Sequence, residues 1–384
     1  MILLRESTVP LRHARQADYH NYLAGVYKST AQCILTIILP GFRSIQTSNL
    51  PLAFNIASFE MSTERPLVLV LGATGRTGQS IINALSASGN FRIAALVRQE
   101  SISKPVIETY RKSGVEIRIG DLKDSVEKLT EALAGVDVFI SAVVAWLIED
   151  QKVAIRAAKA AGVKRFIPCD FATPGERGIR ELHDQKLAVR DFIKEVGVPY
   201  TFIDVGWWMQ LSLPLPERSG GPMKTRSHTV YGPGNNKMLV TDLKHIGTYV
   251  ARVVADPRTL NQAVMIWEDE VTQLEAHEIG ERVSGEGDAL KAKRVYVSAD
   301  ALKQDLAAAK AARAKDPTDI FAALNLTWSE YMYSMHILEE NTLTNAKRLG
   351  YLDARELYPD VPQHSLEEYA KEFYAMEDPS KVYE

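Results

Sequence analysis

Residues 67–78 read LVLVLGATGRTG, an apolar run that passes directly into a glycine-rich turn. Five consecutive apolar residues predict a strand buried on both faces of a parallel sheet. Within the turn, Gly72, Gly75 and Gly78 fit the pattern G-x-x-G-x-x-G. We expect Gly72 to allow a sharp turn, Gly75 to let the backbone approach a pyrophosphate, and Gly78 to let a helix pack closely on the strand. The helix that follows would then present free N–H groups to phosphate oxygens.

Strands and helices alternate after this turn. Strands are predicted at 67–71, 92–97, 115–119, 136–141, 165–168 and 200–205, with helices at 78–87, 107–113, 126–133, 151–161 and 181–196. A helix at 246–254 and a strand at 263–267 are expected to return to the same sheet. This order predicts an α/β fold with a doubly wound parallel sheet.

Composition excludes several classes of protein. The 384 residues are 46% hydrophobic and 24% charged, which is typical of globular chains and excludes disordered, collagen-like and coiled-coil proteins. The formal charge of −3 argues against a nucleic-acid partner. Cys33 and Cys169 are too few for a disulfide framework and fit a reducing compartment. No apolar run reaches the length of a membrane helix, so no membrane association is expected.

Residues 1–60 precede the predicted fold and have a different composition. They are rich in arginine, and their apolar residues show no sustained period of 3.6 or 2. We predict a disordered extension, either a mitochondrial transit peptide or upstream sequence counted as coding, with the compact part starting near Met61. The predicted location is cytoplasmic, or mitochondrial if the extension is a working transit peptide.

Two arginines indicate which dinucleotide binds. An acidic residue after the second strand would accept a hydrogen bond from the ribose of NAD, but this chain has Arg98 there. Arg98 could pair with a 2′-phosphate, and Arg76 in the glycine turn could approach the same group. NADP(H) is therefore the predicted cofactor, unless both arginines are simply solvated surface residues.

A lysine occupies the apolar stripe of the predicted helix 181–196. That stripe consists of Leu182, Lys186, Val189, Ile193 and Val196. Burial disfavours the charged form of a lysine, which would make Lys186 a proton donor or base near neutral pH. Alternatively, its stem packs while its ammonium reaches water. The Tyr-x-x-x-Lys pair of short-chain reductases does not occur here.

From about Pro66 to Phe373 the chain resembles the isoflavone reductase-like group of the NmrA-like, atypical short-chain reductases. The matching stretches are GATGRTGQS (72–80), LVR (96–98), GVEIRIGDL (114–122), GVDVFISAV (135–143), AAGVKRFIPCDF (160–171), VGVPYTFIDVGWW (196–208), KHIGTYVARVVADPRTLN (244–261) and LGYLDARELYPD (349–360). The resemblance implies a Rossmann domain at 61–205 that binds NADPH, with 241–270 returning to its sheet, and a substrate lobe at 206–384. It also implies an acid/base or polarising role for Lys186.

The chain departs from the family pattern at two places. Cys169-Asp170-Phe171-Ala172 replaces a serine–glutamate–phenylalanine–glycine stretch, and Gly206-Trp207-Trp208 replaces asparagine–cysteine–phenylalanine. Trp208 stands where an aromatic ring packs near the nicotinamide, and the two tryptophans could form a flat apolar wall for an aromatic substrate, or simply pack in the core. These changes put the substrates of the plant members in doubt. The predicted cofactor contacts are Gly72, Thr74, Gly75, Arg76, Thr77, Gly78, Arg98, Ser141, Phe171 and Trp208, and the predicted substrate contacts are Trp207, Trp208 and Met209.

Other reactive side chains are assigned minor roles. Cys169 has no base near it in the sequence, which favours a buried structural cysteine over a nucleophile. His183 and His228 could line the pocket or lie on the surface, and the histidines show no metal-ligand spacing, so no metal site is expected.

Together these features predict a reductase that uses NADPH. It would transfer hydride to a conjugated C=C or C=O of a small, aromatic or specialised metabolite, with Lys186 supplying the proton. Residues 210–240 are expected to close over the ligand, and the protein to be a monomer or homodimer. The alternative is a non-catalytic NmrA-like protein that senses dinucleotides and regulates transcription.

Overall fold

The computed structural model describes residues 64–383, which belong to one compact unit, Ser62–Glu384. The extension predicted at 1–60 lies outside the described residues. None of the helices within 64–383 is both long and apolar enough to cross a membrane.

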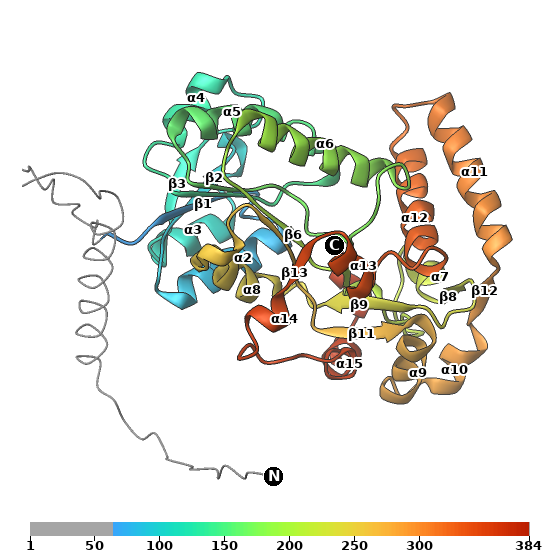
Figure 1. Cartoon of the computed structure of the whole chain (residues 1–384). Helices are drawn as coiled ribbons and strands as arrows, with labels where there is room; N and C mark the ends of the chain where they lie inside the picture. Colours follow the sequence, from blue (N-terminus) through green and yellow to red (C-terminus); the bar gives the residue numbers. More distant parts are fainter. Residues whose placement is uncertain (1–63, 384) are drawn as a thin grey trace, which may run out of the picture. The chain divides into compact units, whose positions relative to one another are not determined.

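A parallel sheet at the centre of this unit has the strand order β3-β2-β1-β4-β5 (Figure 1). Its strands are β1 (Leu67–Leu71), β2 (Arg92–Val97), β3 (Glu116–Ile119), β4 (Val138–Ser141) and β5 (Arg165–Ile167). All five residues of β1 are buried, as expected for a strand covered on both faces. Because β2 and β4 flank β1 on opposite sides, the chain reverses its winding there, which is where α/β sheets bind ligands. The predicted fold class is confirmed.

Three further parallel strands extend this arrangement. β6 (Thr201–Asp204) pairs with β10 (Gln262–Met265), which pairs with β13 (Tyr351–Asp353). A single bridge between Phe166 and Tyr200 joins β6 to β5. The strand expected at 263–267 is thus β10, whereas β13, three residues long, is too short for its periodicity to be recognised.

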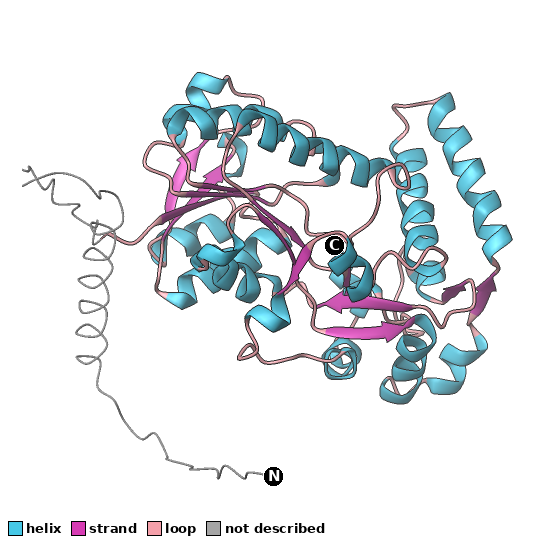
Figure 2. Ribbon diagram, in the orientation of Figure 1, coloured by secondary structure: helices cyan, strands magenta, loops and turns pink. Residues whose placement is uncertain are grey.

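Helices cover both faces of the sheet (Figure 2). On one side lie α4 (Val126–Ala132), α5 (Gln151–Ala161) and α6 (Glu181–Val196), and on the other α2 (Arg76–Ser88), α3 (Pro105–Lys112) and α8 (Ile246–Ala255). α2 begins two residues earlier than its predicted start at Gly78. It packs directly on α8: a Cβ on Gly247 would lie 2.0 Å from the carbonyl oxygen of Ser80, so this crossing requires glycine.

The second lobe contains short strands and most of the C-terminal helices. Its strands are β7 (Trp207–Trp208), β9 (Lys237–Thr241) and β11 (Asp269–Thr272) in one sheet, and β8 (Thr229–Tyr231) with β12 (Val295–Val297) in another. Its helices are α7 (Lys224–Ser227), α9 (Gln273–Val283), α10 (Gly287–Ala292), α11 (Ala299–Lys315), α12 (Ile320–His336) and α15 (Leu366–Ala375). Two more helices, α13 (Leu343–Arg348) and α14 (Ala354–Leu357), lie on either side of β13 in the chain. Short 3-10 turns lie at Gln99–Ser101, Ala145–Leu147, Met209–Leu211, Pro257–Thr259 and Pro379–Tyr383. A capping box begins α15, where Ser365 and Glu368 accept from each other's backbone N–H.

The prediction that residues 210–240 form a closing lid is not supported by their packing. Leu213, Leu215 and Met238 are buried in the same cluster as Phe373 of α15. Because this segment contributes core side chains to the second lobe, moving it as a lid would expose them to water.

Candidate active site

The glycine turn between β1 and α2 is shaped by contacts of the backbone with itself. Gly72 has φ +79°, and a Cβ there would lie 2.2 Å from the carbonyl oxygen of Ala142. A Cβ on Gly78 would lie 2.2 Å from the carbonyl oxygen of Gly72. A Cβ on Gly75 would meet only that same oxygen, at 3.4 Å. Gly72 and Gly78 are therefore required by packing, whereas Gly75 leaves an open backbone surface that a phosphate can approach.

The N-terminus of α2 fits an anionic ligand. Its N-cap residue, Gly75, provides no side-chain cap, and the first turn contains no acidic residue. The free N–H groups and the positive end of the helix dipole are thus available to a phosphate. Tyr110 of α3 braces the turn from behind, because its hydroxyl donates to the carbonyl oxygen of Ala73 over 2.6 Å. The residues present thus suit the pyrophosphate of a dinucleotide.

The two predicted phosphate-binding arginines follow the neighbouring strands β2 and β1, Arg98 directly and Arg76 after the glycine turn. Arg98 follows β2, is exposed, and pairs with Glu100 at 3.2 Å. Arg76 opens α2, is exposed, and donates to the carbonyl oxygen of Lys381 over 3.0 Å. Exposed contacts of this kind contribute about 0–1 kcal/mol, so either guanidinium can turn to a ligand at little cost.

Ser141 and Phe171 lie on segments next to the turn. Ser141 ends β4 opposite Leu71, and within residues 64–383 its buried hydroxyl oxygen has no hydrogen-bond partner. Phe171 follows β5 with φ +38°, a conformation that side chains of this size rarely adopt. Such strain is concentrated at functional segments, because it persists only where the surroundings impose it.

Lys186 is buried in α6, with 7% of its surface exposed. Its ammonium does not extend to water: Nζ donates to the carbonyl oxygen of Asp170 over 2.6 Å. Asp170 lies in the loop after β5, at the carboxyl edge of the sheet. The backbone N–H of Phe171 in this loop donates to Ile203 near the end of β6, and Val205 donates back to Ala172. These bonds connect the lysine-bearing side of the site to the segment that leads into β7.

The two tryptophans of β7 contact different clusters. Trp207 packs among the residues of the second lobe, with its ring 5.5 Å from that of Tyr331 and 6.0 Å from that of Trp328. Trp208 packs against the main core under the parallel sheet. Consecutive residues of a strand point to opposite faces, so the two rings do not form the single flat wall that was predicted. Met209, also predicted to contact substrate, is completely buried in the second lobe.

With this geometry established, comparison with known proteins identifies the family. The NmrA-like family matches residues 64–370. The chain belongs to the NmrA-like family.

Individual relatives match about four-fifths of this NmrA-like protein and nearly the whole of their own length. Asnovolin J 5′,6′-dehydrogenase of Aspergillus novofumigatus is 34% identical over 79% of this chain and 94% of its own length. Eugenol synthase 1 of Petunia hybrida is 30% identical, covering 81% and 99%. Among solved structures, isoflavone reductase has a TM-score of 0.62 with 26% identity, covering 81% of this chain and 100% of its own. AtPrR2 solved with NADP⁺ and (+)-pinoresinol has a TM-score of 0.64 with 25% identity, covering 81% and 99%.

An aromatic recess lies beside Trp207 in the second lobe of the NmrA-like protein. It is lined by Trp207, Leu211, Ser212, Arg226, Ser227, Thr229, Tyr231, Met238, Gln273, His277, Trp328, Met332 and His336. Burial lowers the pKa of His277 and of His336 to about 3, so both are neutral at pH 7. The Trp328 indole donates to the Tyr231 hydroxyl over 3.0 Å. The free volume of this recess is about 20 Å³, which holds about one water molecule, so the lining would have to open to admit an aromatic ring.

The other side chains singled out in the sequence do not line this recess. His183 is buried, with Nε2 2.9 Å from the carbonyl oxygen of Gly175, and His228 is buried nearby on the second lobe. The Cys169 thiol donates to the carbonyl oxygen of Val143 over 3.0 Å, and burial raises its pKa to about 11. A thiol with that pKa is a structural residue rather than a nucleophile.

A buried charge network behind Lys186 has no signal in the sequence. The Arg190 guanidinium lies 3.0 Å from Asp170 and 3.0 Å from Asp204, and donates to the Tyr351 hydroxyl over 2.6 Å. Burial raises the pKa of Asp170 to about 6 despite the charge of Arg190. Burial also acts to raise the pKa of Asp204, but the Arg190 charge together with the hydrogen bonds from Tyr351 and Arg190 lowers that pKa overall. The network anchors the loop whose Asp170 carbonyl receives the Lys186 ammonium.

Proposed function

We propose that this NmrA-like protein is an NADPH-dependent oxidoreductase that delivers hydride to a conjugated C=C or C=O of a small aromatic metabolite. The observation that carries the proposal is the Lys186 ammonium, buried and held by the Asp170 carbonyl at the carboxyl edge of a dinucleotide-binding sheet. A regulatory protein that only senses the dinucleotide needs no buried proton donor there.

The glycine turn, the open N-terminus of α2 and the two arginines would hold the cofactor. NADPH supplies the hydride when bound. The pyrophosphate would lie over Gly75, and Arg76 and Arg98 would contact the 2′-phosphate. AtPrR2, whose structure contains NADP⁺, supports this choice of cofactor.

Lys186 would supply or relay the proton that accompanies reduction. Its contact with the Asp170 carbonyl fixes the position of Nζ, and burial keeps competing water away. General acid catalysis of this kind is worth about 10²- to 10⁴-fold in rate. Relatives named eugenol synthase and phenylcoumaran benzylic ether reductase support an aromatic substrate.

A substrate panel tests this function. The purified protein would be mixed with NADPH and conjugated aromatic enones, ketones and quinones, and NADPH oxidation would be followed by absorbance with product analysis. We expect turnover on at least one class. Tight NADPH binding without any turnover across the panel would contradict the reductase assignment and favour a dinucleotide sensor.

Exchanging Arg98→Asp should change cofactor selectivity. Losing a charge-assisted contact costs about 1.5–3 kcal/mol, so we expect NADPH affinity to fall by about 10- to 100-fold while NADH affinity changes little. Fluorescence titration with both cofactors measures this. Arg111→Asp, on the exposed surface of α3, is the matched control and should bind both as the wild type does. Equal losses for NADPH and NADH in Arg98→Asp would contradict the 2′-phosphate contact.

A further inference from the structure

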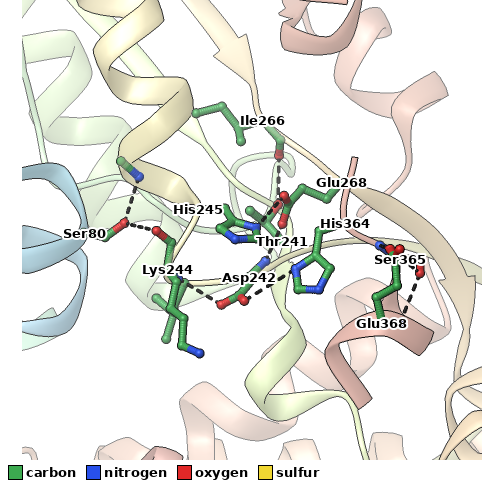
Figure 3. A network of polar contacts seen from close by, with 12 residues as sticks. Ser80, Thr241, Asp242, Lys244, His245, Ile266, Glu268, His364, Ser365 and Glu368 are labelled. Carbon is green, nitrogen blue, oxygen red and sulfur yellow. Dashed lines mark hydrogen bonds and ion pairs between the residues drawn. The ribbon is translucent and has the colours of Figure 1, made fainter. Parts of the chain in front are cut away.

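Two histidines and two carboxylates converge beside the N-terminus of α8 (Figure 3). Asp242 directly follows β9, and His245 is the N-cap residue of α8. Glu268 directly precedes β11, and His364 directly precedes Ser365, the N-cap of α15. His364 is far from the others along the chain, which is why the histidine spacing in the sequence indicates no metal site.

We propose that Asp242, His245 and His364 bind a divalent transition metal, zinc in the first instance. One ligand atom from each residue can be chosen so that all lie within 4.8 Å of one another. Zinc bonds nitrogen and oxygen at about 2.0–2.2 Å, which places the ligands of a tetrahedral site about 3.3–3.6 Å apart. Small side-chain rotations would close the present arrangement around an ion. Three protein ligands also leave a fourth position for water.

The Asp242 carboxylate has one oxygen engaged and one directed into the cluster. Oδ1 accepts from Gln210 Nε2 over 2.6 Å and from the Lys244 backbone N–H over 2.9 Å. Oδ2 is completely buried, and within residues 64–383 it has no hydrogen-bond partner. It faces His364 Nδ1, which is also buried and without a hydrogen bond, at 3.7 Å. That separation is too long for a hydrogen bond but close to the spacing of two ligands on one metal.

Glu268 orients His245 in the way that carboxylates orient metal-bound histidines. Its Oε1 lies 2.9 Å from His245 Nδ1, which directs Nε2 of the ring to the ion. Its Oε2 accepts from the backbone N–H of Asp242 over 2.9 Å. Glu268 therefore supports two of the three ligands, although it need not touch the metal itself.

Charge also favours a cation at this place. Asp242 and Glu268 are both buried, and the ion pairs of their carboxylates within the described chain are with histidines. The ammonium of Lys244 pairs instead with exposed Glu372 at 3.1 Å. Metal ligation requires neutral imidazoles, and with both imidazoles neutral the two buried carboxylates carry a negative charge that a divalent ion would neutralise.

The ion would join segments from both parts of the fold. The hydroxyl of Ser80 in α2 donates a hydrogen bond to the carbonyl oxygen of Lys244 over 2.7 Å. Gln210, bonded to Asp242, lies two residues after Trp208. Bound zinc would therefore fix α8, the tryptophan segment and the start of α15 together, next to the cofactor helix.

Zinc titration of the metal-free chain tests the site. The full chain, prepared without a histidine tag and stripped with EDTA, would be titrated with Zn²⁺ by calorimetry at pH 7 and its thermal unfolding followed. We expect the wild type to bind one equivalent of zinc, and His364→Gln and Asp242→Asn to bind it with an affinity reduced at least about 100-fold. Adding zinc should raise the unfolding temperature of the wild type but not that of the two variants. Co²⁺ substitution should give the visible absorption of a tetrahedral site without thiolate bands.

Two further variants separate ligation from folding. Glu268→Gln should bind zinc about 10- to 100-fold more weakly, as expected for a residue that orients a ligand. Glu367→Gln, on the exposed surface of α15, should bind as the wild type does. In EDTA, His364→Gln and the wild type should unfold at the same temperature, which shows that the variant is folded. Unchanged zinc binding in His364→Gln and Asp242→Asn, or no binding by the wild type, would overturn the proposal.

Discussion

Lys186→Met is expected to lower kcat by about 10²- to 10⁴-fold while leaving NADPH affinity nearly unchanged. Methionine keeps the length and apolar character of the side chain, so the stripe of α6 that packs on the core is preserved. Only the ammonium that donates to the Asp170 carbonyl is removed. Steady-state kinetics with the best substrate of the panel, and NADPH fluorescence titration, measure the two quantities.

Lys194→Met is the control for this experiment. Lys194 is on the same helix, two turns further on, but is exposed and lies over the rings of Tyr200 and Phe202. The kcat of the Lys194→Met variant should match that of the wild type. Wild-type turnover in Lys186→Met would rule out the proton role of this lysine, and loss of NADPH binding in that variant would mean that Lys186 serves the cofactor instead.

Arg190→Met is expected to destabilise the fold by about 3–5 kcal/mol, because it leaves two carboxylates buried without their partner. Arg190 pairs with Asp170 and Asp204 at 3.0 Å each, and all three side chains are buried. Urea unfolding measures the change. The loop carrying the Asp170 carbonyl should also lose its anchor, so any folded fraction should show a reduced kcat.

Two companion variants keep this prediction testable if Arg190→Met does not fold. Tyr351→Phe removes one hydroxyl from the network and should cost about 1.5–3 kcal/mol, the value of a hydrogen bond to a charged group. Arg177→Met breaks an exposed pair with Asp191 and should change stability by less than about 0.5 kcal/mol. Equal stability of Tyr351→Phe and Arg177→Met would show that the buried network contributes nothing.

Local sequence patterns were sufficient to predict the structure where a short stretch of chain folds through contacts among its own residues. The apolar run at β1 and the glycines that follow specify strand, turn and helix within twelve residues, and the close contact at Gly78 is with the backbone of Gly72 in the same turn. The stripe on α6 placed Lys186 on the apolar face of its helix for the same reason, whereas only the structure shows that its ammonium is buried.

Longer-range features could not be read in this way. Trp207 and Trp208 suggested a continuous wall because they are adjacent in the sequence, but strand geometry turns them to opposite sides. The partner of Arg190 on β13, Tyr351, is 161 residues away, and no sequence period connects them. His364 likewise meets Asp242 only because α15 folds back beside α8.

The sequence by itself therefore determined the parallel α/β sheet, the phosphate-binding turn and the place of Lys186 on the apolar stripe of its helix, because each depends on neighbours within a few turns of chain. Tertiary structure alone decided which groups surround that lysine, which face of β7 carries each tryptophan, and which carboxylates meet the two histidines. Those contacts depend on how distant strands pair and helices pack, and local residue patterns carry no record of such pairings.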